Sequence, residues 1–218
     1  MREPVKGVSP AGRRREERAK ATRERIVAAA VRLFLERGYV ATTVTAIAAD
    51  AGVAPATVYQ AFGTKHAVLA RALDIAIAGD AEPVEVLRRD WVDQARREPD
   101  PGRRLARIVR GASEVVARTA PLKQVMRDAA ATDPEVRDLI DEDGRRRHRT
   151  HEALVDLVIE AGPLRDGLRR DDAVATYFAL VSTDTYDALV AGLGWTVARW
   201  QAWLVDVLGR TLLGESDR

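Results

Sequence analysis

Residues 43–65 read TVTAIAADAGVAPATVYQAFGTK and predict two short helices joined by a glycine turn. Thr43 is a good N-cap for the first helix, because its hydroxyl can accept a hydrogen bond from a free amide of the first turn. Gly52 suits the left-handed residue that ends such a helix. The second helix begins near Pro55, since proline at the first helical position removes no needed amide, and it ends at about Phe62. The pattern is typical of a helix-turn-helix.

The outer face of the second helix has the properties of a surface that reads the DNA major groove. Val58 and Phe62 are four residues apart and face inward, so Thr57 and Gln60 point outward. Both of these side chains can hydrogen-bond to base edges, and small alanines beside them let the backbone come close. Similar helix pairs also occur in bundles that never bind DNA, so the choice between the two depends on the rest of the chain.

Charge divides the 218-residue chain into two parts and favours DNA binding. Residues 1–65 hold 12 Lys and Arg against 6 Asp and Glu, whereas the remainder holds 23 against 27. A basic N-terminal third on a mildly acidic body is typical of a nucleic-acid-binding domain joined to another domain. A length of 218 residues allows one large domain or two small ones.

Cysteine is absent, which excludes disulfides and thiolate metal sites and fits a reducing compartment. We find no signal peptide and no apolar run near the ~20 residues that a membrane helix needs. We therefore expect a cytoplasmic protein with no membrane partner.

Helical periodicity continues to the end of the chain, and we find no β-hairpin pattern, so we expect an all-α fold of about nine helices. Residues 1–19 contain prolines, glycines and a run of arginines, and predict a disordered basic segment; an arm in the DNA minor groove is the alternative. The helices should cover about 20–37, 44–51, 55–62, 65–78, 84–97, 105–116, 121–126, 134–161, 173–190 with a possible kink at 182–184, and 195–213.

The resemblance of the N-terminal part to the DNA-binding domain of the tetracycline-repressor (TetR) family is specific, since many positions match in order. It rests on Thr22 to Ile26, Leu33-Phe34, Gly38-Tyr39, Thr42 to Val44, Ile47-Ala48, Ala51 to Val53, Thr57 to Tyr59 and Phe62 to Lys65. The resemblance implies a DNA-binding domain over residues 20–80, with its helix-turn-helix at about 43–62. A C-terminal helical regulatory and dimerisation domain over 81–218 would follow.

Two departures from the family pattern affect which bases are read. Ala61 stands where family proteins often have histidine, and Gln60 stands where an aromatic or basic residue is common. His66 also replaces a frequent glutamate. The expected DNA contacts are Thr43, Thr45, Ala54, Pro55, Ala56, Thr57, Tyr59, Gln60, Lys65 and Arg23, with Lys65 on a phosphate.

The last two predicted helices are unusually apolar. Three of the four tryptophans fall between residues 195 and 203. An intramolecular core would explain this, and so would self-association, which the resemblance favours. The candidate homodimer interface is Trp195, Trp200, Trp203, Leu204, Val207 and Leu208.

The resemblance also implies a pocket for a small-molecule effector, for which we expect an apolar or aromatic compound. Its candidate lining is Trp91, Val109, Met126, Tyr177, Phe178 and Tyr186, although a residue of each of these kinds is more often simple core.

One possible metal site, formed by His148, His151 and Glu152, is rejected because four arginines crowd it and a cationic surround opposes a metal ion. We find no catalytic motif and no cofactor fingerprint, so we expect neither an enzyme nor a cofactor. The sequence predicts a ligand-responsive regulator, most often a repressor, that binds a double-stranded palindromic operator as a dimer. An activator, or a DNA-binding protein of architectural or adaptor role without any small ligand, is the alternative.

Overall fold

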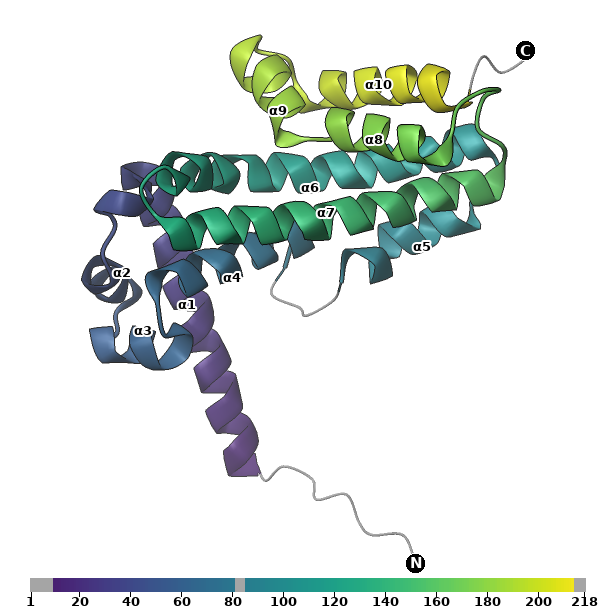
Figure 1. Ribbon diagram of the computed structural model, residues 1–218. Coiled ribbons are helices and arrows are strands. Elements are labelled where there is room, and N and C mark those ends of the chain that lie inside the picture. The colour runs from purple at the N-terminus through teal and green to yellow at the C-terminus, as the bar shows by residue number, and fades with distance from the viewer. Residues whose placement is uncertain (1–9, 81–84, 214–218) are drawn as a thin grey trace, which may run out of the picture. The chain divides into compact units, whose positions relative to one another are not determined.

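The computed structural model describes residues 10–80 and 85–213, and within these ranges the chain is helical and contains no β-strand (Figure 1). The described part has ten α-helices, close to the expected nine, and the prediction of an all-α fold is confirmed. No helix in the described ranges is long and apolar enough to cross a membrane. The chain divides into two compact units, Met1–Ala72 and Leu73–Arg218, with the division inside one helix.

The first helix, α1 (Pro10–Ala41), is longer than predicted. Residues 10–19, expected to be disordered, belong to it, while residues 1–9 of that prediction lie outside the described part. The reason is composition: alanine, arginine, glutamate and lysine are good helix formers. The pairs Arg13/Glu17 and Glu16/Lys20 also have the spacing at which opposite charges support a helix.

Gly38 interrupts α1 near its end, with φ 76° and ψ 166°. The interruption leaves backbone carbonyls that the helix no longer pairs, and Thr42 compensates for this. Its buried hydroxyl lies 2.8 Å from the Gly38 oxygen and 3.1 Å from the Leu33 oxygen. Three helices follow in the order α2 (Val44–Ala51), α3 (Pro55–Phe62) and α4 (Lys65–Ala78).

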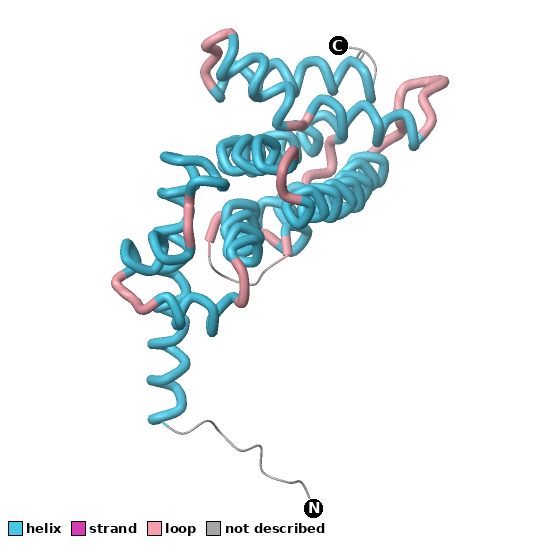
Figure 2. The backbone as a smooth tube through the Cα atoms, turned by 60° about the vertical axis from the view of Figure 1, so that its left-hand side comes forward, coloured by secondary structure: helices cyan, strands magenta, loops and turns pink. Residues whose placement is uncertain are grey.

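The C-terminal unit is built on two long helices, α6 (Pro101–Ala130) and α7 (Pro134–Ala161), which pack side by side (Figures 1 and 2). A short 3₁₀ segment (Val86–Arg88) and α5 (Asp90–Arg97) lie on one side of this pair. On the other side lie α8 (Arg170–Leu180) and α10 (Val197–Leu208). Their shared core is apolar and includes Ile108, Leu154 and Trp200, which are fully or almost fully buried.

Pro121 does not end a helix, contrary to the prediction of separate helices before and after it. It lies on the exposed side of α6, which continues to Ala130. A proline inside a helix removes the hydrogen bond to the carbonyl four residues earlier, here that of Ala117. Packing outweighs this loss, since α6 buries residues before and after Pro121, among them Ala120 and Leu122.

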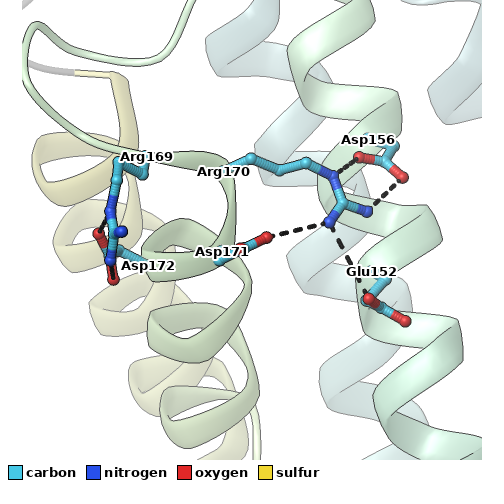
Figure 3. A network of polar contacts seen from close by, with 6 residues as sticks. All are labelled: Glu152, Asp156, Arg169, Arg170, Asp171 and Asp172. Atoms are coloured by element: carbon cyan, nitrogen blue, oxygen red, sulfur yellow. Dashed lines mark hydrogen bonds and ion pairs between the residues drawn. The ribbon is translucent and has the colours of Figure 1, made fainter.

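An arginine network fixes the start of α8 on α7 (Figure 3). Arg170 donates from Nε and one terminal nitrogen to the two oxygens of Asp156, at 2.7 and 2.8 Å. Its other terminal nitrogen lies 3.9 Å from Glu152. This bidentate pair lowers the pKa of the Asp156 carboxyl through the hydrogen bond and the charge of Arg170. The position of α8 along α7 is thereby defined.

The predicted helix 173–190 is broken at Val181–Ser182, at the edge of the suspected kink. Ser182 caps the short α9 (Thr183–Tyr186), because its hydroxyl accepts from the Thr185 amide. A π-helical segment (Asp187–Gly192) follows α9, and a second one (Gly209–Leu213) follows α10.

Candidate DNA-binding and effector sites

The helix-turn-helix forms as its caps predict. The hydroxyl of Thr43 accepts from the Ala46 amide at 3.1 Å at the start of α2. Gly52 at its end has φ 65°, the left-handed conformation that favours glycine. The amides of Gly52 and Val53 then donate to the last carbonyls of α2, at 3.2 and 3.0 Å. This turn sets the direction in which α3 leaves α2.

Helix α3 buries one face and exposes the other. Val58 is buried on the inner side, and Tyr59 is 54% exposed. The rest of the outer face consists of Ala54, Pro55, Ala56 and Gln60, all exposed, and Thr57, partly exposed. Helix α3 contains no charged residue, so this surface offers methyl groups, hydroxyls and one amide to an approaching partner.

Lys65 lies elsewhere than its predicted phosphate contact implies. Its Nζ donates to the Tyr39 oxygen at 2.9 Å and the Thr42 oxygen at 3.0 Å. It also lies 4.0 Å from the centre of the Tyr39 ring, where a cation is attracted to the aromatic face. Lys65 therefore ties the first turn of α4 to the segment between α1 and α2. Its phosphate role stays a prediction.

The other predicted DNA contacts lie on the surface of the same unit. Thr45 and Thr43 are exposed at the start of α2, with the Thr43 hydroxyl already engaged as a cap, and Arg23 is exposed on α1. Arg32, which pairs with Asp50 and so joins α1 to α2, was not among the predicted residues. An arginine and an aspartate 18 residues apart carry no signal of such pairing.

The predicted effector residues are divided among different parts of the C-terminal unit. Val109, Met126 and Tyr177 are buried. Trp91 lies flat against Gly111, where an added Cβ would be 2.4 Å from the indole ring. These are packing positions as well as candidate lining.

Two of the predicted effector residues lie beside His151, which the sequence analysis considered only as a metal ligand. The ring centroids of His151 and Tyr177 are 4.9 Å apart, and those of His151 and Phe178 are 5.6 Å apart. Tyr186 instead contacts Trp200, with ring centroids 5.3 Å apart.

Buried polar atoms without a hydrogen-bond partner among the described residues of this unit include Nδ1 of His151, the hydroxyl of Tyr177 and Nε1 of Trp200. Burial lowers the pKa of His151 to about 3, and the charges of Arg147, Lys123 and His148 add to the effect. His151 is thus neutral near pH 7. Burial also raises the pKa of the Tyr177 phenol.

The predicted dimer residues separate into two groups. Trp200, Leu204 and Leu208 are fully buried in the core of this chain, which does not favour direct contact with a partner; their interface role stays a prediction. They lie on the face of α10 that packs onto α6 and α8. Trp195, Trp203 and Val207 keep partly exposed surface, and their interface role stays a prediction.

The fold and the exposed α3 define the class of helix-turn-helix DNA-binding proteins. Residues 26–72 match the family model described as bacterial regulatory proteins, tetR family. No curated protein matches the chain.

Solved structures share the fold over most of the chain. NalD, the secondary repressor of the MexAB-OprM efflux pump in Pseudomonas aeruginosa, has a TM-score of 0.67 and 19% identity, over 92% of this chain and 100% of that one. FadR from Bacillus subtilis in complex with stearoyl-CoA has a TM-score of 0.66 and 19% identity, over 88% and 99%. A protein from Saccharomonospora viridis described as a transcriptional regulator, in complex with choline, has a TM-score of 0.65 and 21% identity, over 88% and 98%. The family model at the helix-turn-helix confirms the resemblance to the TetR family that the sequence predicted there.

Proposed function

We propose that the protein is a transcriptional repressor that binds a palindromic operator as a homodimer and is released by a small apolar or aromatic ligand. DNA binding is assigned to residues 20–80, and regulation and dimerisation to residues 81–218. A DNA-bound role places the protein in the cytoplasm. NalD is a repressor with the same fold, and two other proteins of this fold are complexes with a small molecule.

The observation that carries the proposal is the outer face of α3. It projects uncharged small side chains together with Thr57 and Gln60, which is the chemistry of major-groove recognition. In a twofold dimer, two such helices would face major grooves one helical turn apart, ~34–36 Å. The operator would then be roughly palindromic.

Regulation in this proposal passes along α4, which runs without interruption from one compact unit into the other. Its last turns are held within the C-terminal unit. Arg118 of α6 donates to the oxygens of Ala76 and Ile77, at 3.1 and 3.3 Å. Arg146 of α7 donates to Asp74 at 2.9 Å. A ligand that favours the form unable to bind DNA must supply ~5.5 kcal/mol of differential affinity to reverse the populations.

Selection of genomic fragments by the purified protein at ~150 mM salt, near physiological ionic strength, followed by protection mapping, tests the proposal. A single palindromic site beside a transporter or enzyme gene, overlapping its promoter, supports a local repressor. A site upstream of the promoter favours an activator. Many weak and unrelated sites favour an architectural protein and count against the ligand.

Gln60→Ala tests the role of α3 in reading bases. We expect it to relax preference at one position per half-site by ~1–3 kcal/mol, the value of a good base contact. Gln94→Ala, a change at another exposed glutamine but on α5, is the matched control and should leave binding unchanged. Unaltered preference in Gln60→Ala would exclude Gln60 as a base reader.

Light scattering tests the homodimer. Leu193 lies between the π-helical segment and α10, two residues before Trp195, and is 68% exposed, as is Val40 at the end of α1. We expect Leu193→Glu to yield monomers and Val40→Glu to leave the dimer intact. The same mass for both variants would remove this surface from the interface.

A further inference from the structure

A cluster of polar groups without partners lies where α7 meets α8. Nδ1 of His151 and the hydroxyl of Tyr177 are buried and have no hydrogen-bond partner among the described residues. Their rings contact edge to face, with centroids 4.9 Å apart. Buried polar groups in folded proteins are normally paired, because an unpaired one keeps its full desolvation penalty. Two such groups on rings that pack against each other point to a polar partner from outside the chain.

Arg147, one helical turn before His151, extends this cluster. Its guanidinium carbon lies 4.0 Å from the centre of the Phe178 ring. It makes no hydrogen bond or ion pair within the described ranges. The neighbouring carboxylate of Asp143 is instead engaged by Lys123 at 2.8 Å. The planar donors of Arg147 are therefore available, and their geometry matches a carboxylate.

The charge around the cluster favours an anion. The positive charges of Arg147, Lys123 and His148 all lower the pKa of His151. The carboxylates of Asp143 and Asp184 raise the pKa of Arg147. Burial lowers the pKa of the Arg147 guanidinium, and this loss of hydration outweighs the two carboxylates. A bound anion would offset the cost of burying the Arg147 charge, whereas a bound quaternary ammonium group would increase that cost.

We propose that Arg147, His151 and Tyr177 form the polar end of the effector site and bind the carboxylate of an organic acid with an apolar body. Arg147 donates to both carboxylate oxygens, Tyr177 donates its hydroxyl, and His151 donates from Nδ1 in that tautomer. The apolar body packs on Phe178 and on the apolar core that includes Tyr177. This assignment of a ligand class rests on the function proposed above.

Matched probes test the charge preference on the full-length protein without DNA. Binding of decanoate, 1-decanol and decyltrimethylammonium is measured by calorimetry, and 2-naphthoate, 2-naphthylmethanol and 2-naphthylmethyl-trimethylammonium supply an aromatic set. We expect at least one carboxylate to bind about tenfold or more tightly than its alcohol, as charged hydrogen bonds allow, and the ammonium probes to bind most weakly. Equal affinity of acid and alcohol, tighter binding of an ammonium probe, or no carboxylate binding at millimolar concentration overturns the proposal.

Two substitutions assign the preference to residues. Arg147→Met and Tyr177→Phe should each weaken carboxylate binding about tenfold or more and change alcohol binding by no more than about twofold. Arg149→Met, at an exposed arginine on the same helix, should change neither. Because the Tyr177 hydroxyl has no partner, Tyr177→Phe should keep or raise the melting temperature, whereas a hydroxyl with only a structural role would lower it. A carboxylate preference that survives in both variants refutes the site.

The two proposals fail in different ways. If carboxylates bind through Arg147 and Tyr177 but leave operator affinity unchanged, the anion site is supported and its role as the effector site is refuted. If another compound releases the operator and carboxylates do not bind, the repressor function stands and this inference falls.

Discussion

Acidification should destabilise the C-terminal unit through one buried side chain, His151. Its ring is 6% exposed and its pKa is lowered to about 3, by burial first and then by the charges of Arg147, Lys123 and His148. In the unfolded chain the same imidazole has a pKa of about 6.5. Between these values the unfolded state binds a proton that the folded state does not. The free energy of unfolding therefore falls as pH falls below 6.5.

The size of the effect follows from the pKa difference. Each pH unit within this window corresponds to about 1.4 kcal/mol. A change from pH 7.5 to pH 5 crosses about 1.5 units of the window and should lower the free energy of unfolding by ~2 kcal/mol. The Asp156 carboxyl, whose pKa is lowered, adds stability above its unfolded value of about 3.9 that is lost only at lower pH.

Urea unfolding followed by tryptophan fluorescence measures this directly, since all four tryptophans belong to the C-terminal unit. The loss between pH 7.5 and pH 5 should be ~2 kcal/mol smaller in His151→Leu than in the unsubstituted protein. His148→Leu, at an exposed histidine of the same helix, should retain the full loss. An equal loss in His151→Leu would show that His151 accepts a proton in the folded state, and the reasoning from burial would be wrong.

Three further changes test packing and capping. Lys65→Met should lower stability by ~1.5–3 kcal/mol, the value of hydrogen bonds to a charged group; a fall of about 1 in the slope of log affinity for DNA against log salt would support its predicted phosphate contact, and an unchanged slope would remove it. Gly111→Ala should lower stability by ~1–3 kcal/mol in thermal unfolding, because the added Cβ would lie 2.4 Å from the Trp91 ring. Gly144→Ala, whose Cβ would have no atom within 4 Å, should raise stability by ~0.5–1 kcal/mol. Equal effects of the two changes would contradict the packing of Trp91 on Gly111. Thr42→Val should cost ~1–3 kcal/mol in urea unfolding because the carbonyls near Gly38 lose a buried donor, and an unchanged midpoint would exclude that role.

Local chemistry explains why the helix-turn-helix was predictable. The signals at Thr43, Gly52 and Pro55 act within one turn of their own positions, and the structure has α2 and α3 at the expected residues. Pro121 failed as a signal because α6 is held by long-range packing. Propensity rules describe an isolated helix and do not include such packing.

The sequence could not predict which neighbour a buried side chain packs against. The apolar pattern of α10 was recognised, but periodicity does not distinguish the subunit core from a dimer face. Trp200 packs inside and Trp203 keeps exposed surface, although both belong to the same apolar segment. For Lys65, position in the motif suggested a phosphate, while the folded chain offers two carbonyls and an aromatic ring within reach. Only the tertiary fold brings those groups together.

The arginine-rich turn of α7 shows what the composition of a segment can and cannot predict about its ligands. Its positive charge opposes a metal ion at the histidines, and the same charge favours an anion, but the sequence does not tell which arginine is available. The structure makes that distinction. Arg145 and Arg149 are close to Glu142, at 2.8 and 3.9 Å, and Arg146 pairs with Asp74 at 2.9 Å. Arg147 turns toward Phe178 and His151 without a carboxylate of its own. An arginine that is partly buried and unpaired beside two unpaired polar atoms is costly to stability, and the binding of an acid is the role that accounts for all three groups together.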